Sequence, residues 1–219
     1  MYNLARLELG RIGLRAGVCV PLLYFGTVIV ASFFVPGYSH VRQAASDLGM
    51  ATVPHPAIFN TGAMLVGICT LGASQAVWIA LRRLGVRALA AAYVAGALAL
   101  LGVAQIFAAR FPAPDPRHGG FGLAFPIAFA PLVVAGLHRY VGLRAFARYS
   151  LIVFLGFVAL TPEYLFRHGV IRPYAGLLQR LISLFLFPWV GALALVLLRG
   201  FSTPPNKTLQ PTRVLAPVP

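Results

Sequence analysis

The sequence predicts an all-α polytopic membrane protein: six transmembrane helices in a bundle, with a short amphipathic helix in the first external connection. Three observations predict this class: long apolar stretches, a scarcity of charge, and arginines gathered in every second connection. Of the 219 residues, 59% are hydrophobic and only 10% are charged. A soluble helical bundle needs polar outer faces on its helices, and this chain has too few polar residues to supply them.

The spans follow from apolar length. The hydrocarbon core of a bilayer is about 30 Å thick, which takes about 20 helical residues to cross. Helices satisfy every backbone amide within their own segment, as the interior of a bilayer requires. We expect spans at residues 14–35, 59–81, 88–107, 121–137, 150–166 and 174–198. Residues 1–13 would form a cytoplasmic N-terminal segment, and the proline-rich residues 199–219 a disordered cytoplasmic tail.

Arginine and lysine residues indicate the orientation. Twelve of them fall before the first span, in the second and fourth connections, and after the last span, against five in the other three connections. Basic residues of short loops stay in the cytoplasm, so both termini are predicted to be cytoplasmic. An even number of spans requires the same arrangement. The pattern is typical of a protein of the bacterial inner membrane.

The net charge of +14 does not indicate nucleic-acid binding. The positive residues are scattered over four short cytoplasmic segments, without a continuous basic stripe or aromatic residues placed to stack on bases. We expect them to contact the headgroups of membrane lipids instead. The GxxxG pair Gly13 and Gly17 is the one motif that would support a homo-oligomer.

The external face is predicted to hold most of the reactive side chains. Three of the four acids and four of the five histidines lie in the external connections. In the first connection, Ser39 would cap a helix that runs to Leu48, with Gly49 just after its end. His40, Gln43 and Asp47 would share one edge of that helix. The alternative is a solvated amphipathic connector without a binding role.

The other two external connections each add an acid. Three prolines in the second connection hold Asp115 in a stiff frame near His118. A tight proline turn would have the same sequence, so a purely structural role stays open. Arg180 lies within the last span, and ionisable groups at membrane depth usually point inward and pair. We expect Arg180 to pair with Glu163 of the third connection.

These residues suggest one polar cup on the external face, which would bind a small polar ligand or a lipid headgroup in a sensing or accessory role. Its candidate residues are Ser39, His40, Asp47, Asn60, Asp115 and His118, with Glu163 and Arg180 as a structural ion pair. An alternative is an enzyme, a hydrolase or transferase of lipid headgroups at the outer leaflet. Zinc held by His40, Asp47, Asp115 and His118 would then activate water. No known metal-binding spacing supports this zinc site. The ligand-binding hypothesis requires no cofactor. A transporter is a second alternative, but charged residues near the midplane are lacking.

Several short motifs carry a resemblance to a known family. They are the stretch from Tyr38 to Gly49 with its Y-S and S-D-L-G elements, the N-T-G sequence that begins at Asn60, and the Phe111-Pro112, Asp115 and His118 pattern. In these the chain resembles the bacterial and archaeal membrane proteins of domain-of-unknown-function family 998. In layout it is more distantly similar to the eukaryotic Frag1/DRAM/Sfk1 group. The resemblance implies a six-helix bundle with its motifs on the external side, and it implies no activity.

Overall fold

The computed structural model describes residues 4–166 and 173–202, which form helices and turns without any strand. Five helices in these ranges are long and apolar enough to cross a membrane. They are α1 (Leu4–Phe33), α2 (Pro56–Arg83), α3 (Ala88–Arg110), α5 (Arg144–Phe166) and α6 (Ala175–Ser202). The predicted class, an all-α polytopic membrane protein, is therefore confirmed. Residues 203–219, which make up most of the predicted tail, lie outside the described ranges.

The fourth predicted span, residues 121–137, is not one continuous helix. It consists of two short 3₁₀ helices, η2 (Gly120–Gly122) and η3 (Phe125–Phe129), followed by the short α-helix α4 (Ala130–Ala135). Phe121, in the middle of the first of these turns, adopts a left-handed backbone with φ of 54°, which no continuous α-helix allows. Pro126 and Pro131 lack the N–H groups that a longer α-helix would use. Of the six predicted spans, five are therefore long helices, and the fourth is a broken apolar segment.

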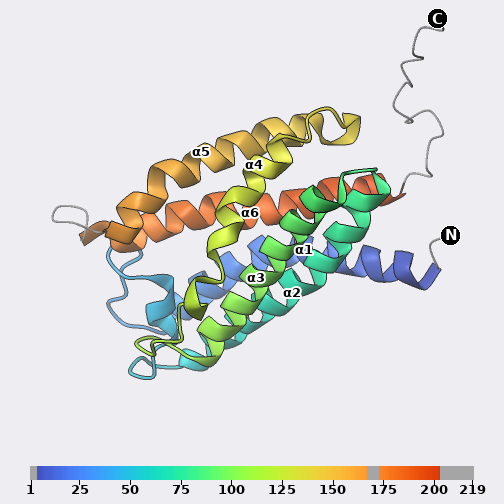
Figure 1. Ribbon diagram of the computed structural model, residues 1–219. Helices are drawn as coiled ribbons and strands as arrows, with labels where there is room; N and C mark the ends of the chain where they lie inside the picture. Colours follow the sequence, from blue (N-terminus) through green and yellow to red (C-terminus); the bar gives the residue numbers. More distant parts are fainter. Residues whose placement is uncertain (1–3, 167–172, 203–219) are drawn as a thin grey trace, which may run out of the picture.

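The helices run along one axis, and Figure 1 shows that the described chain ends, in α1 and α6, lie at the same end of the bundle. We call this the terminal end, and it also carries the α2–α3 connection and η4 (Val141–Leu143). The opposite end, the loop end, carries connections 34–55 and 111–119. The broken segment with α4 leads from the loop end back towards the terminal end, where α5 begins (Figure 1). The path of the chain thus keeps the predicted alternation of its connections.

The helix predicted from Ser39 to Leu48 is shorter than expected. An α-type turn closes from the amide of Gln43 to the carbonyl oxygen of Ser39 at 2.9 Å, and only Ala45–Gly49 is helical, as the 3₁₀ helix η1. Ala44 separates the two with an extended backbone, ψ 153°. The connection also does not lie flat on the surface, because Ala45 and Leu48 are buried in a small apolar cluster between α1, α2 and α3.

The GxxxG pair of α1 packs inside the chain. A Cβ atom on Gly13 would lie 2.5 Å from the carbonyl oxygen of Gly72 in α2, and one on Gly17 would lie 2.8 Å from Cβ of Ala194 in α6. Both glycines therefore allow α1 to approach two neighbouring helices closely. Because these faces are already occupied within one chain, the pair does not offer a surface to a second copy.

Trp189 lies at the centre of the bundle and is fully buried. Its indole Nε1–H donates to Oγ of Ser150 on α5 at 2.9 Å, and the ring stacks on Phe146 with 6.1 Å between centroids. The hydroxyl of Ser150 in turn donates to the carbonyl oxygen of Phe146 at 2.9 Å. Every polar group in this contact between α5 and α6 is thereby satisfied, as an apolar interior requires.

Candidate functional site

The first connection docks against the first turn of α6 at the loop end. The backbone N–H of Leu177 donates to the carbonyl oxygen of Val41 at 2.9 Å. Gly176 permits this close approach, because a Cβ atom there would lie 2.3 Å from the carbonyl oxygen of Gln43. The side chain of Gln179 extends the contact by accepting a 2.6 Å hydrogen bond from the N–H of Ala45. This backbone contact places the side chains of the connection beside α6.

Arg180 is the centre of the resulting polar cluster. Its Nη1 donates to the carbonyl oxygens of Gln43 at 2.8 Å and Gly176 at 2.9 Å. Its Nη2 donates to the hydroxyl of Tyr38, and its Nε donates to Nδ1 of His40 at 3.3 Å. Arg180 therefore points towards the first connection, and all four of these partners are neutral groups. We call Tyr38, His40, Gln43 and Arg180 the Arg180 cluster.

The side chains of the Arg180 cluster also affect one another's ionisation. Burial and the nearby charge of Arg180 lower the pKa of His40, so its imidazole is held neutral. Burial raises the pKa of Tyr38, and the charge of Arg180 opposes that rise. Since Nδ1 of His40 accepts from Arg180, the proton of the neutral ring lies on Nε2. His40 is exposed, so this N–H is a donor at the surface.

A second polar contact joins α6, close to the Arg180 cluster, to α1 in the bundle interior. The hydroxyl of Ser183, one turn along α6, donates to the carbonyl oxygen of Gln179 at 2.8 Å and lies 3.0 Å from the hydroxyl of Tyr24 in α1. Tyr24 stacks on Phe187 with 3.8 Å between ring centroids. These contacts fix the start of α6 against α1, which makes Arg180 part of a rigid element.

Three of the predicted binding residues serve the local backbone of the first connection. Ser39 Oγ accepts from the amide of Arg42 at 3.4 Å, and Asp47 Oδ2 accepts from the amide of Ala44 at 3.0 Å. Asn60 donates from Nδ2 to the carbonyl oxygen of Gly49 at 3.0 Å. Its Oδ1 is buried and has no hydrogen-bond partner among the described residues. These side chains hold the connection in shape beside the Arg180 cluster.

The second connection forms a separate, self-contained turn. Arg117 donates to both carboxylate oxygens of Asp115, at 3.0 Å from Nε and 2.8 Å from Nη2, and its guanidinium lies 3.9 Å from the ring centroid of Phe111. His118 Nδ1 lies 2.9 Å from the carbonyl oxygen of Phe111. Hydrogen bonds from Arg117 lower the pKa of Asp115 to about 2. Both predicted residues of this connection thus bond to their own neighbours.

The predicted ion pair and the predicted zinc ligands have different outcomes. Glu163 lies on α5, but its side chain is outside the described part of the structure, so its pairing with Arg180 stays a prediction. Within residues 4–166 and 173–202, no three His, Cys, Asp or Glu residues form a group able to hold a metal ion. Asp115 accepts hydrogen bonds from Arg117, and His40 accepts one from Arg180. The geometry therefore gives no support to zinc bound by His40, Asp47, Asp115 and His118.

The predicted binding residues did not include Tyr38, Gln43 or Gln179, although Gln43 was expected on the same helix edge as His40. Tyr38 lies within the Y-S element, yet a tyrosine next to a predicted membrane surface is usually an interfacial anchor. The signal that pointed to this region was Arg180 together with Gln179 inside an otherwise apolar span.

The chain was compared with protein families, curated proteins and solved structures. The model of the family described as "Protein of unknown function (DUF998)" matches residues 18–196. No curated protein and no solved structure matches the chain.

Proposed function

Since the chain belongs to the DUF998 family and has the apolar helices of an integral membrane protein, we propose that it binds an anionic group at Arg180. The anion is a phosphate or carboxylate, carried by a lipid headgroup or by a small soluble ligand. The protein acts as a receptor or accessory protein and performs no chemistry on its ligand. The positive charge of Arg180 and the N–H donors of Arg180 and His40 would hold this anion.

One observation carries this proposal: Arg180 is a partly buried cation whose partners, among the side chains and backbone groups that the structure describes, are all neutral. Two ion pairs occur among the described side chains, Arg11 with Glu8 and Arg117 with Asp115, and neither includes Arg180. A cation removed from water is stabilised by an anion more than by neutral acceptors. An incoming phosphate or carboxylate would supply that charge.

The neighbours of Arg180 offer further donors on the same side. The Nε2–H of His40 is exposed, and Tyr38 has an aromatic ring edge-on to His40 with 5.1 Å between centroids. Because the pKa of His40 is lowered, the ring donates as a neutral group and adds no second charge. One positive charge with neutral N–H donors suits a single anionic group. A divalent metal ion would instead need oxygen or nitrogen atoms with free lone pairs.

The binding test uses purified protein in nanodiscs and compares Arg180→Lys with wild type. Lysine keeps the charge but loses the planar fork that holds Gln43, Gly176 and Tyr38 together. Native mass spectrometry and a titration with phosphatidylglycerol or inorganic phosphate should each show one bound ligand whose affinity is about tenfold weaker in the variant. If only phosphatidylglycerol binds, the ligand is a lipid. If only inorganic phosphate binds, the ligand is a soluble molecule.

Arg42→Lys is the matched control, because Arg42 lies in the same connection and its exposed side chain makes no described contact. It should bind like the wild type. If the Arg180→Lys protein melts normally and binds both probes as wild type does, the proposal fails.

The proposal also includes a topology: six crossings of the bacterial inner membrane, both termini in the cytoplasm and the loop end outside. The arginine distribution supports it, and so does the return path through α4 (Figure 1). Single cysteines in a variant without Cys19 and Cys69 test it through a membrane-impermeant thiol reagent on whole cells. Ala51→Cys in the first connection should react, and Gly85→Cys in the α2–α3 connection should not.

A further inference from the structure

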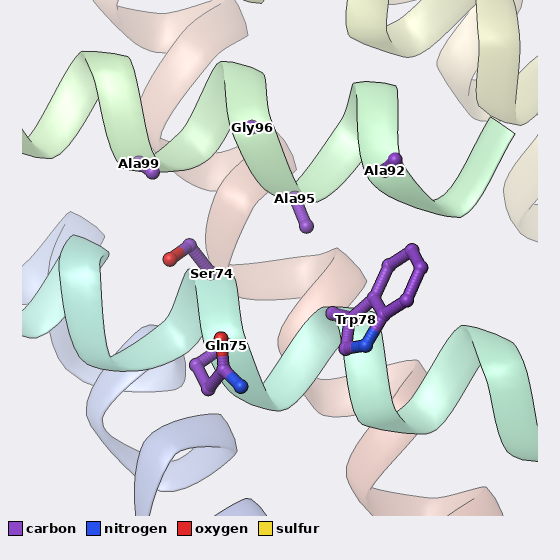
Figure 2. Close-up of a pocket in the computed structure, with 7 residues that line it drawn as sticks. All are labelled: Ser74, Gln75, Trp78, Ala92, Ala95, Gly96 and Ala99. Carbon is purple, nitrogen blue, oxygen red and sulfur yellow. The ribbon is translucent and has the colours of Figure 1, made fainter. Parts of the chain in front are cut away.

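A groove lies between α2 and α3 in the half of the bundle near the terminal end, with a volume of about 270 Å³. Figure 2 shows its residues on the two helices, with Ser74, Trp78 and Ala95 directed into the space between them. Ser74 and Ala95 are buried and form its floor. The hydroxyl of Ser74 donates to the carbonyl oxygen of Leu71 at 2.7 Å, so the floor has no unsatisfied polar atom of its own. We call this hollow the α2–α3 groove.

Three side chains of different polarity follow one another along the α2 side of the groove. Gln75, Trp78 and Arg82 are spaced i, i+3 and i+7, so they follow one face of the helix towards the terminal end. Gln75 and Trp78 line the groove, and the guanidinium of Arg82 lies 5.9 Å from the ring centroid of Trp78. From the helix interior outwards, the face therefore presents an amide, an indole and a cation.

Gln75 is an exposed amide at membrane depth. Seven residues of helix place it about 10 Å further into the bundle than Arg82. It has no hydrogen-bond partner among the described residues. Hydrocarbon cannot satisfy an amide, so its exposure in a bilayer is costly without a partner. A group that accepts a hydrogen bond at this depth would remove the cost.

The α3 side of the groove consists of small residues. Ala92, Gly96 and Ala99 are spaced i, i+4 and i+7 and line the groove opposite Gln75 and Trp78 (Figure 2). A Cβ atom on Gly96 would meet nothing within 4 Å. The space above Gly96 is thus open, and its wall of alanine and glycine suits a hydrocarbon chain.

Arg82 places a positive charge beside the α2–α3 groove. Its Nη1 donates to the carbonyl oxygen of Val86 at 2.5 Å, and no described carboxylate forms an ion pair with it. Its guanidinium carbon lies 5.9 Å from the ring centroid of Trp78, next to the end of α2 at Arg83. Arg87 follows in the same connection and is exposed. Two cations beside a membrane surface favour an anionic headgroup.

We propose that the α2–α3 groove binds one glycerophospholipid with an anionic headgroup, from the leaflet at the terminal end. Its phosphate pairs with Arg82, an ester carbonyl oxygen accepts from the side-chain N–H of Gln75, and an acyl chain lies along Ala92, Gly96 and Ala99. A second copy of the chain fits less well, because a two-fold contact through this face would bring Arg82 and Arg87 of both copies together.

The proposal is tested by native mass spectrometry of the full chain, released from nanodiscs that contain phosphatidylglycerol and phosphatidylcholine in equal amounts. The wild type should retain one phosphatidylglycerol in preference to phosphatidylcholine. Gly96→Leu fills the open space, and Arg82→Gln removes the cation, so each should reduce that retained lipid about tenfold. Gly26→Leu is the matched control, since a Cβ on Gly26 also meets nothing within 4 Å but lies on α1. It should retain the lipid.

Arg180→Lys separates this lipid from any ligand at the loop end. That change lies outside the groove, so one phosphatidylglycerol should stay bound in the variant, even where a second one at the loop end is weakened. Retention of both lipids to the same extent would overturn the proposal, as would wild-type retention by Gly96→Leu and Arg82→Gln. A stable dimer that Gly96→Leu dissociates would also overturn it and assign the groove to a second copy.

Discussion

Arg180 donates from Nε to Nδ1 of His40 at 3.3 Å and so joins two segments that are 140 residues apart in the sequence. The bond needs a neutral imidazole, because a protonated ring has no acceptor at Nδ1. The contact therefore couples the first connection to α6 in a way that depends on pH.

His40 should make the stability of the protein fall below about pH 6.5. In the unfolded chain a histidine titrates near 6.5, whereas the pKa of His40 in the folded protein is lower. Between the two values the unfolded state binds more protons, so the contribution is complete above the unfolded pKa and is lost as the pH falls through the folded one. Melting temperatures measured between about pH 5 and about pH 8 should fall less steeply for His40→Asn than for wild type.

His55→Asn is the control for that titration. His55 lies in the same connection with φ of 52°, a conformation that asparagine tolerates. This variant leaves the bond between Arg180 and His40 in place, so it should retain the pH dependence that this bond confers. Parallel curves for wild type and His40→Asn would show that the bond from Arg180 does not influence stability.

Arg180→Ala should lower the free energy of unfolding by about 2 kcal/mol, because hydrogen bonds from a charged donor to Gln43, Gly176 and Tyr38 are lost together. Thermal unfolding in detergent measures the change. Arg42→Ala, in the same connection, should melt within about 0.5 kcal/mol of wild type. An unchanged melting temperature for Arg180→Ala would mean that these bonds are replaced by water without loss.

Apolar length was sufficient to predict five helices but not the shape of the fourth span. Residues 121–137 are apolar enough to cross, yet the left-handed backbone at Phe121 and the prolines at 126 and 131 divide them. Hydropathy averages over a window and does not register which residues lack an N–H or adopt positive φ. The broken segment could have been anticipated from the glycine and proline positions.

The candidate site could be located but not assembled from the sequence. Arg180 was expected to point inward towards Glu163, a pairing that stays a prediction, and its described partners are Tyr38, His40 and two backbone carbonyl oxygens. Backbone acceptors have no sequence signature. The helix predicted from Ser39 to Leu48 was interrupted for the same reason, because Val41, Gln43 and Ala45 give their backbone groups to α6.

Gly176→Ala should separate the first connection from α6. The new Cβ atom would lie 2.3 Å from the carbonyl oxygen of Gln43, so one of the two backbones must move. Overpacking of this kind costs about 1–3 kcal/mol. Limited proteolysis of the first connection should become faster, and the melting temperature should fall. Gly200→Ala on the same helix meets nothing within 4 Å and should behave like the wild type; equal protection of both variants would contradict the close contact.

Asp115 should stay ionised at a pH where most carboxylates are protonated. The bidentate hydrogen bonds from Arg117 hold its pKa at about 2. The chain has two aspartates, so the carboxyl carbon signal of labelled Asp115 can be assigned by its loss in Asp115→Asn. Its titration midpoint should move towards about 3.9 in Arg117→Gln. Stability from this pair is present above the unfolded pKa and lost as the pH falls towards 2, and its exposure keeps that contribution small.

Ser150→Ala should destabilise the centre of the bundle. It removes the acceptor of the Trp189 Nε1–H, and both residues are fully buried, so neither water nor lipid can replace the bond. A buried donor left unsatisfied costs about 1–3 kcal/mol. Unfolding can be followed by Trp189 fluorescence in a Trp78→Phe background, which leaves one tryptophan. Ser32→Ala is the control, because its hydroxyl bonds only to the carbonyl oxygen of Ile29 in its own helix. Equal stability of the two variants would show that the indole finds another acceptor.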